Sequence, residues 1–332
     1  MQACDMVLWS LAELRHAAPA CFDALAEAGT AALSNPAKRR HFTSQNLSTC
    51  LWAYGRLNMV HSEPCRRFLS ALAARAAEPG ALDGNPHALG NVAWGLAVAQ
   101  LLDAPLLQRV WGLASLKARS TNESFLSQIF QAELSLRLER TGHSTSLAAS
   151  ADVGKTFSIL LEAGILRLAS QQLWRGRLSC TARPPTRLQR AVGDAVRALG
   201  VAVVEEYCSK GAEYSIDLAV PSAHVAIEVD GPSHFAENTR QPLGQTALKR
   251  RLLVALGWRP VPVPFFDFPR RGHARVLYMR EALAHFAGLA TPLPPRPPDW
   301  DAAREADKLA LLRELGGRFA LVAGAAVEAA DL

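Results

Sequence analysis

Two acidic side chains at alternate positions of one predicted strand are the residues best suited to chemistry. Residues 223–230 alternate apolar and polar side chains, which predicts a β-strand with Glu228 and Asp230 on the same side. Two residues of strand separate such carboxylates by roughly 7 Å. Asp217, in another predicted strand, could join them. The cluster is costly by repulsion unless a cation, a proton or a basic partner relieves it, and Mg²⁺ with bound phosphate oxygens is a candidate.

A basic partner follows in the next predicted helix, over residues 244–256. This helix carries three consecutive cations, Lys249, Arg250 and Arg251. At about 100° per residue they fan across more than half of the helix circumference. We therefore expect at least one of them to face the carboxylates and one to face solvent.

His234 follows the acidic strand after a sharp turn and has two interpretations. It could shuttle a proton or donate a hydrogen bond to a phosphate, or it could cap the loop after the strand, which is the interpretation we favour. Arg240 adds positive charge to the same segment. Phe235, Phe265 and Phe266 could offer stacking faces to unpaired bases.

These residues belong to a predicted mixed α/β unit that begins with a helix capped by Thr186 and closed by Gly200. The helix pattern covers residues 186–199, strand patterns cover 201–207, 214–220 and 223–230, a second helix covers 244–256, and an extended segment covers 259–266. The predicted order is α-β-β-β-α-β.

The front of the chain repeats with a period of about 40 residues. Trp9, Trp52 and Trp94 stand in similar apolar contexts, and a weaker fourth unit has Phe130 in that place. A proline follows each tryptophan where a second helix would begin, since proline is tolerated in a first helical turn. Each unit is typical of a helix hairpin whose apolar side must stack on its neighbours, which predicts an α-solenoid. An ordinary helical bundle with the tryptophans in its core is the alternative.

Composition and pattern divide the chain into four regions. We predict a helical repeat array at 1–140, a helical connector and linker at 141–185, an α/β domain at 186–288, and a proline-rich spacer with a C-terminal helix at 289–332. The fold class is therefore α plus α/β.

Charge and hydropathy exclude some classes of protein. The 332 residues include 36 Lys and Arg against 30 Asp and Glu, a net charge of +6 that favours polyanions without identifying one. A hydrophobic content of 49% excludes a wholly disordered chain. No apolar run approaches the roughly 20 residues that a bilayer requires, so we expect no membrane partner.

The stretch from Asp217 to Phe268 resembles the RAP domain, an RNA-binding module of organellar RNA-processing proteins. The matching residues are Ile227 to Phe235, Leu243-Gly244, Thr246, Leu248 to Leu253, Leu256-Gly257-Trp258 and Val261 to Phe266. The helix hairpins in front are similar to octotricopeptide repeats, which commonly precede this domain.

The resemblance to RAP domains implies a restriction-endonuclease-like fold of the PD-(D/E)XK class. Active members of that class hold magnesium with an aspartate on one strand and Glu-x-Lys on the next. Asp217 and Glu228 match the acidic positions, whereas Asp230 stands where the lysine is expected. Lys249 could substitute from the helix. These four residues are the candidate catalytic set of a Mg²⁺-dependent nuclease, with the three carboxylates as the metal ligands.

The function that the resemblance implies is RNA binding in the processing, stability or translation of organellar transcripts, in a mitochondrion or a chloroplast. The repeats would bind single-stranded RNA, and the RAP-like domain would contact its backbone or end through His234, Arg240, Lys249, Arg250 and Arg251. Other RNA-processing proteins are expected partners. Two alternatives stay open: a Mg²⁺-dependent RNA endonuclease, and a helical scaffold that binds proteins. No transit peptide is visible before the first predicted helix, so the protein either is not targeted or lacks its true N-terminus here.

Overall fold

The computed structural model describes residues 2–115, 122–140, 169, 171–173, 184–208, 214–270 and 272–291. The chain divides into two compact units. The first comprises residues 1–178 and 233–256, and the second comprises residues 179–232 and 257–332. The predicted connector at 141–185 and the proline-rich spacer with its helix at 289–332 lie largely outside the described residues.

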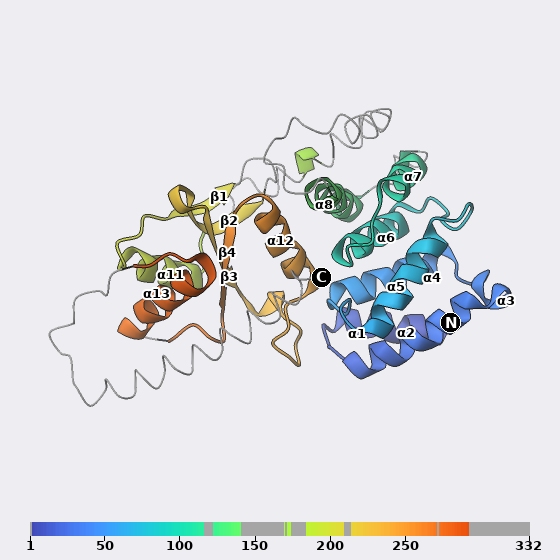
Figure 1. Ribbon diagram of the computed structural model, residues 1–332, viewed down its shortest axis with the longest axis horizontal. Helices are drawn as coiled ribbons and strands as arrows, with labels where there is room; N and C mark the ends of the chain where they lie inside the picture. Colours follow the sequence, from blue (N-terminus) through green and yellow to red (C-terminus); the bar gives the residue numbers. More distant parts are fainter. Residues whose placement is uncertain are drawn as a thin grey trace. The chain divides into compact units, whose positions relative to one another are not determined.

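The described part of the first unit is helical (Figure 1). Its helices are α1 (Gln2–Glu13), α2 (Pro19–Ser34), α3 (Pro36–Arg39), α4 (Ser44–Arg56), α5 (Glu63–Ala76), α6 (Pro86–Val98), α7 (Ala104–Ser115), α8 (Glu123–Arg140) and, from later in the chain, α12 (Gly244–Ala255). Within the described residues, none of the helices is long and apolar enough to cross a membrane.

Prolines lie at the start of the second helix in the first three predicted hairpins. Pro19 is the first residue of α2, and Pro64 and Pro105 are the second residues of α5 and α7. A proline at these positions loses no helical hydrogen bond, because the first N–H groups of a helix have no partner within it. The predicted starts of the second helices are confirmed.

The first helices of successive hairpins pack in chain order. Helix α1 contacts α4, α4 contacts α6, and α6 contacts α8, while the second helices α2 and α5 contact each other. Gly55 allows α4 and α6 to approach closely, because a Cβ atom added there would lie 3.2 Å from Gly95 Cα. Tyr54 of α4 meets Phe22 of α2 and Phe68 of α5 edge-on, which joins the two rows of helices.

The second unit contains a four-stranded mixed sheet in the order β1-β2-β3-β4. Its elements are α11 (Arg187–Arg197), β1 (Val204–Cys208), β2 (Ser215–Val220), β3 (Val225–Asp230), β4 (Arg259–Pro264) and α13 (His273–Ala287). Strands β1, β2 and β3 pair antiparallel, and β4 runs parallel to β3. The chain thus follows the predicted α-β-β-β-α-β order, to which it adds α13.

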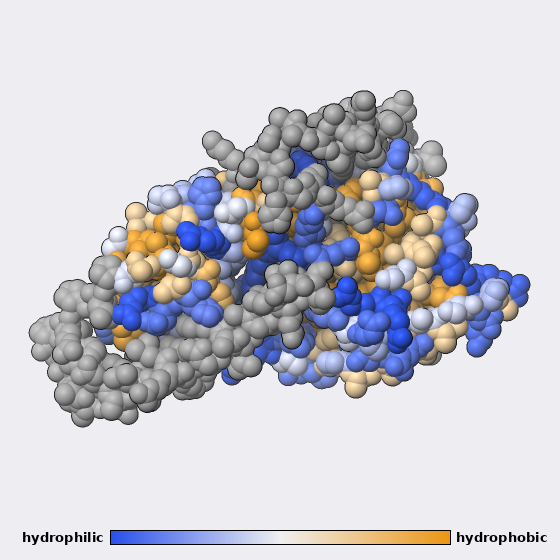
Figure 2. Space-filling model, in the orientation of Figure 1, coloured by the Kyte–Doolittle hydropathy of each residue, from blue (hydrophilic) through white to orange (hydrophobic). Residues whose placement is uncertain are grey.

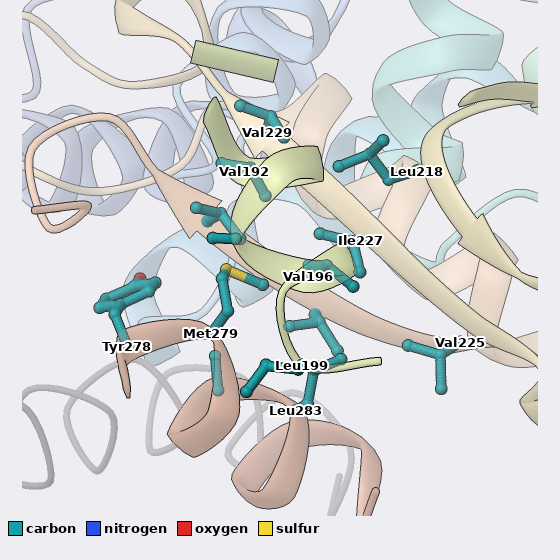
Figure 3. Close-up of a cluster of buried hydrophobic side chains, with 14 of the residues drawn as sticks. Val192, Val196, Leu199, Leu218, Val225, Ile227, Val229, Tyr278, Met279 and Leu283 are labelled. Carbon is teal, nitrogen blue, oxygen red and sulfur yellow. The ribbon is translucent and has the colours of Figure 1, made fainter. Parts of the chain in front are cut away.

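Apolar side chains of α11, α13 and the sheet form the core of the second unit (Figure 3). Strand β3 contributes Val225, Ile227 and Val229 to this core. Val192 and Val196 of α11 pack against them, as do Tyr278, Met279 and Leu283 of α13. Since side chains alternate along a strand, Glu228 lies on the other side of β3 from this core.

Candidate functional site

Acidic residues of three neighbouring strands align across the sheet of the second unit. In β1, Glu205 pairs with Leu218 and Tyr207 pairs with Ile216. Glu206 lies between these two residues, so it stands opposite Asp217. Leu218 pairs with Ile227, so Asp217 in turn stands opposite Glu228. The register therefore brings the predicted Asp217 and Glu228 to the same level of adjacent strands, and it adds Glu206 to them.

A side-chain amide bridges two of these carboxylates. Gln189 of α11 donates from Nε2 to Glu206 Oε1 (3.2 Å) and to Asp217 Oδ1 (3.1 Å). Its Oε1 accepts from the Thr186 N–H (2.7 Å), which completes the capping box at the start of α11. Asp217 Oδ2 accepts from the Val229 N–H (2.7 Å). Both oxygens of Asp217 are therefore used by neutral N–H donors.

Metal binding by Asp217, Glu228 and Asp230 stays a prediction. Within the described residues, no three His, Cys, Asp or Glu side chains lie close enough together to hold a metal ion. Mg²⁺ needs oxygen ligands in near-octahedral geometry at about 2.1 Å. Asp217 directs its oxygens at two amides, which stabilise its charge.

Asp230 lies at the carboxyl end of β3 and is 1% exposed. Its backbone carbonyl accepts from the Phe265 N–H (2.9 Å), which joins the ends of β3 and β4. Burial raises the pKa of Tyr278 on α13, and the negative charges of Asp267 and Asp230 raise it further. Asp230 therefore contributes to the raised pKa of Tyr278.

The turn after β4 presents aromatic and cationic side chains together. Phe265 is 39% exposed, and its ring meets that of Phe266 edge-on with centroids 5.1 Å apart. Arg270, also exposed, follows in the same turn. Arg275 holds the turn by donating to the carbonyls of Pro269 (2.9 Å) and Arg270. An exposed ring is suited to stacking with an unpaired base, and an exposed guanidinium a few residues along the chain is suited to neutralising phosphate.

The five predicted RNA-binding residues all lie in the first unit, in a segment over residues 233–256 that we call the strap. They are His234, Arg240, Lys249, Arg250 and Arg251. The strap contains α12, which contacts α4, α6 and α8. The predicted catalytic set is thus divided between the units, with Lys249 in the first and Asp217, Glu228 and Asp230 in the second.

Arg251 bonds to the ends of two helices. Its Nε donates to Glu139 Oε1 of α8 (2.5 Å). Its Nη1 donates to the Val98 carbonyl and its Nη2 to the Ala97 carbonyl, both at 2.8 Å. The last carbonyls of a helix have no partner within it, so a cation placed there completes their hydrogen bonds and complements the helix dipole. Arg251 therefore holds the strap to α6 and α8.

Further contacts attach the strap to the ends of α1 and α4. The Glu237 N–H donates to the Arg15 carbonyl (2.8 Å). Asn238 donates to the Ala17 carbonyl (2.7 Å) and accepts from the Ala17 N–H (2.8 Å). At Gly244, an added Cβ atom would lie 1.9 Å from the Gly55 carbonyl oxygen of α4. The strap thus contacts the C-terminal ends of all four successive first helices.

The other predicted cations of the strap differ in exposure. Arg240 is exposed, and Lys249 and Arg250 are half-buried on α12. The His234 carbonyl accepts from the Leu243 N–H (2.9 Å), and His234 Nδ1 lies 3.3 Å from Thr246 Oγ1. These contacts fasten His234 to the start of α12, in keeping with the loop-capping interpretation.

Polar residues inside the row of first helices bond to one another. Asn91 donates to Ser48 Oγ (3.2 Å), and Gln128 donates to Asn91 Oδ1 (2.7 Å). Ser48 and Asn91 are buried. These hydrogen bonds join α4, α6 and α8.

A basic segment of the first unit was not among the predicted site residues. Lys38, Arg40 and His41 are exposed in and just after α3, where Figure 2 shows hydrophilic side chains gathered. Arg39 is instead bonded to Glu78, and this hydrogen bond is the main reason why the pKa of Glu78 is lowered. The four consecutive basic residues from Lys38 to His41 could have predicted this positively charged surface.

Sequence reasoning also missed Glu206 and Gln189. Glu206 lay within a predicted strand, and Gln189 stands three residues after the Thr186 cap, which is the spacing of a capping box. That spacing predicts the cap. It does not predict that the same amide bridges two carboxylates of the sheet.

Comparison with known proteins supports the resemblance. Residues 227–281 match the model of the RAP domain family, so the segment from β3 through the strap and β4 into α13 is a RAP domain. A curated relative, "RAP domain-containing protein, chloroplastic" from Oryza sativa subsp. japonica, is 29% identical over 188 residues. The match covers 54% of this chain and 27% of the relative, so the chain spans about a quarter of that protein's length. The octotricopeptide-like repeats stay a prediction.

Proposed function

We propose that this chain is an RNA-binding protein of organellar RNA metabolism, acting in the processing, stability or translation of transcripts. The RAP domain at residues 227–281 supports RNA as the ligand, and the chloroplastic relative supports an organelle as the location. Single-stranded RNA is the form that best suits the exposed side chains, because its bases are available for stacking. Other RNA-processing proteins are the proposed partners.

The observation that carries this proposal is the turn after β4, which lies inside the RAP domain. Phe265 is exposed there beside Phe266, and Arg270 follows within the same turn. We propose that a base stacks on Phe265 and that Arg270 contacts the adjoining phosphate. Lys249, Arg250 and Arg240 add positive charge to the domain's sequence, whereas Arg251 acts by holding the strap in place.

The helical hairpins are proposed to form an α-solenoid of octotricopeptide type that binds the same strand. The strap covers the C-terminal ends of the first helices, so RNA would reach the hairpins from another side. The exposed Lys38, Arg40 and His41 provide positive charge for such a contact.

The restriction-endonuclease-like fold remains our proposal for the α/β domain at 186–288. We propose that its carboxylate cluster positions the strands and does not cleave RNA. Gln189 supports this interpretation, because its amide bridges Glu206 and Asp217 where a nuclease would place a cation. A magnesium-dependent endonuclease is the outcome that the test must distinguish.

The test is to incubate the purified chain with labelled single-stranded RNA, with and without Mg²⁺, and to measure binding and cleavage together. We expect binding in both conditions and intact RNA throughout. Magnesium-dependent cleavage that Asp217→Ala abolishes would establish the endonuclease instead. No binding to RNA even at low salt would contradict the proposal and favour a scaffold that binds proteins.

A further inference from the structure

The outer face of α1 exposes large apolar side chains. Met6 is 66% exposed, Trp9 is 53% exposed and Leu14, just after the helix, is 68% exposed, with Val7 beside them at 46%. Single exposed apolar residues are ordinary, but a tryptophan among three others on one short segment marks an interaction surface.

Much of the same face is buried in the next three first helices, where Trp52 of α4 and Gln128 of α8 are half-buried. Met6 and Val7 stand three and two residues before Trp9. The residues at the same spacing from the aromatic residue of the later helices include five that are buried: Thr49 and Cys50 of α4, Asn91 and Val92 of α6, and Ser127 of α8. Trp94, the counterpart of Trp9, is 5% exposed. In these helices the face contacts the preceding first helix: Cys50 Sγ lies 3.6 Å from Asp5 Oδ1 of α1, and Asn91 donates to Ser48 of α4.

The repeated contact defines the shape of a suitable occupant. A Cβ atom added at Gly55 would lie 3.2 Å from Trp94 Cζ3, so the tryptophan of α6 packs where α4 has no side chain. Ala12 and Ala97 hold the place of Gly55 in α1 and α6, and both are buried. A helix that packs on Trp9 therefore needs glycine or alanine at this place.

We propose that the outer face of α1 docks the first helix of another helix hairpin of this class. The proposal rests on continuity, because the α4–α1, α6–α4 and α8–α6 contacts all use this face. A second copy joined head to tail is a poor occupant, because residues of α8 such as Ile129, Ala132 and Leu136 are already buried. RNA is disfavoured by the exposed Glu13, whose charge repels phosphate.

The probe is the full chain with a second copy of residues 44–85 joined in front of Met1. Met1 then follows residue 85 of the added copy, as Pro86 follows residue 85 in the natural chain. The spacing from Met1 to Trp9 equals the spacing from Pro86 to Trp94. Backbone hydrogen exchange over residues 6–14 is the measurement. We expect exchange to slow at least about tenfold relative to the unextended chain, because the added hairpin covers α1.

Two control variants test the geometry of the contact. Gly55→Phe in the added copy alone should remove the protection, because its ring occupies the place of the Trp9 side chain. Arg67→Ala in the added copy, at an exposed position of α5, should leave the protection in place.

Three results would overturn the proposal. The first is that α1 exchanges equally fast in the extended and unextended chains. The second is a dimer of the unextended chain, detected by sedimentation, whose α1 is protected and which Trp9→Glu dissociates; a second copy would then be the occupant. The third is protection of residues 6–14 by single-stranded RNA in the unextended chain.

Discussion

Arg251 contacts three acceptors that belong to two helices of the first unit. The guanidinium is largely buried, and so is its partner Glu139, with side chains 21% and 18% exposed. A planar fork of donors suits this arrangement, because one side chain can bond a carboxylate and two carbonyls at fixed angles. Its position among three consecutive cations predicts an RNA contact, which stays a prediction, and its bonds make it a positioning residue of the strap.

Arg251→Ala is expected to lower the free energy of unfolding of the first unit by about 2–4 kcal/mol, because it leaves a largely buried carboxylate without its cation. Chemical denaturation with helix content as the signal measures this. Arg67→Ala, which removes an exposed ion pair with Glu63, is the matched control and should change stability by less than about 1 kcal/mol. A loss for Arg251→Ala no larger than for Arg67→Ala would contradict the role assigned here.

Asp5 gives a pH dependence with a definite sign. Burial raises its pKa above the ordinary 3.8, although hydrogen bonds from Asn46 and Cys50 oppose the shift. A raised folded pKa means that the stabilising contribution of Asp5 is full below the unfolded pKa and is lost as pH rises through the folded pKa.

Asp5→Asn removes this titration and keeps an oxygen to accept from Asn46. We therefore expect the variant to be at least as stable as the parent at pH 7, with the difference shrinking as the pH is lowered toward about 4. Thermal unfolding of both proteins across this range is the measurement. A difference that grows in the variant's favour as pH falls would show that the sign is wrong.

Some of the carboxylate cluster could be predicted from sequence, and some could not. Strand alternation predicts that Glu228 and the core valines lie on opposite sides of β3, because it depends only on local geometry. The contact between Gln189 and Asp217 could not be predicted, because it depends on how α11 packs on the sheet. The same limit applies to Glu206, whose place opposite Asp217 depends on strand register.

Among the secondary-structure elements, the strap is the segment whose packing partners could not be predicted from the sequence. Its helix α12 was predicted within one residue of its observed end, because Gly257 closes the pattern with a positive φ of 81°. Periodicity shows which residues face a neighbour, but it does not identify that neighbour. Here α12 packs with α4, α6 and α8, and residues 233–256 join the helical unit although they lie inside the RAP domain.

Gly244→Ala tests the packing of the strap. The added Cβ atom would collide with the Gly55 carbonyl oxygen, so α12 must shift, and we expect the first unit to lose at least about 1–3 kcal/mol of stability. Gly112→Ala in α7 is the matched control, because among the described residues nothing lies within 4 Å of its added Cβ atom.

The two variants should move stability in opposite directions, since alanine is favoured over glycine within a helix by about 0.5–1 kcal/mol. Thermal unfolding measures both. Equal effects of the two substitutions would contradict close packing at Gly244.

At the scale of the whole molecule, RNA binding should be largely electrostatic. Arg270 and the exposed basic residues near α3 would each replace counterions on phosphate. For single strands the logarithm of affinity falls with the logarithm of salt by about 0.7 per phosphate contact.

Arg270→Ala should therefore weaken RNA binding and reduce the salt slope by about 0.7, whereas Arg67→Ala should leave both unchanged. Fluorescence anisotropy with a labelled oligonucleotide at several salt concentrations measures affinity and slope together. An Arg270→Ala variant with the slope of the parent protein would remove Arg270 from the proposed interface.

Ultraviolet crosslinking of the purified chain to single-stranded RNA, followed by mass spectrometry of the attached peptides, tests the central claim most directly. We expect crosslinks within residues 265–270 if Phe265 stacks on a base as proposed, and we expect Phe265→Leu to remove them while the chain stays folded. Crosslinks confined to other parts of the chain, or none under conditions in which an unrelated RNA-binding protein crosslinks well, would contradict this claim.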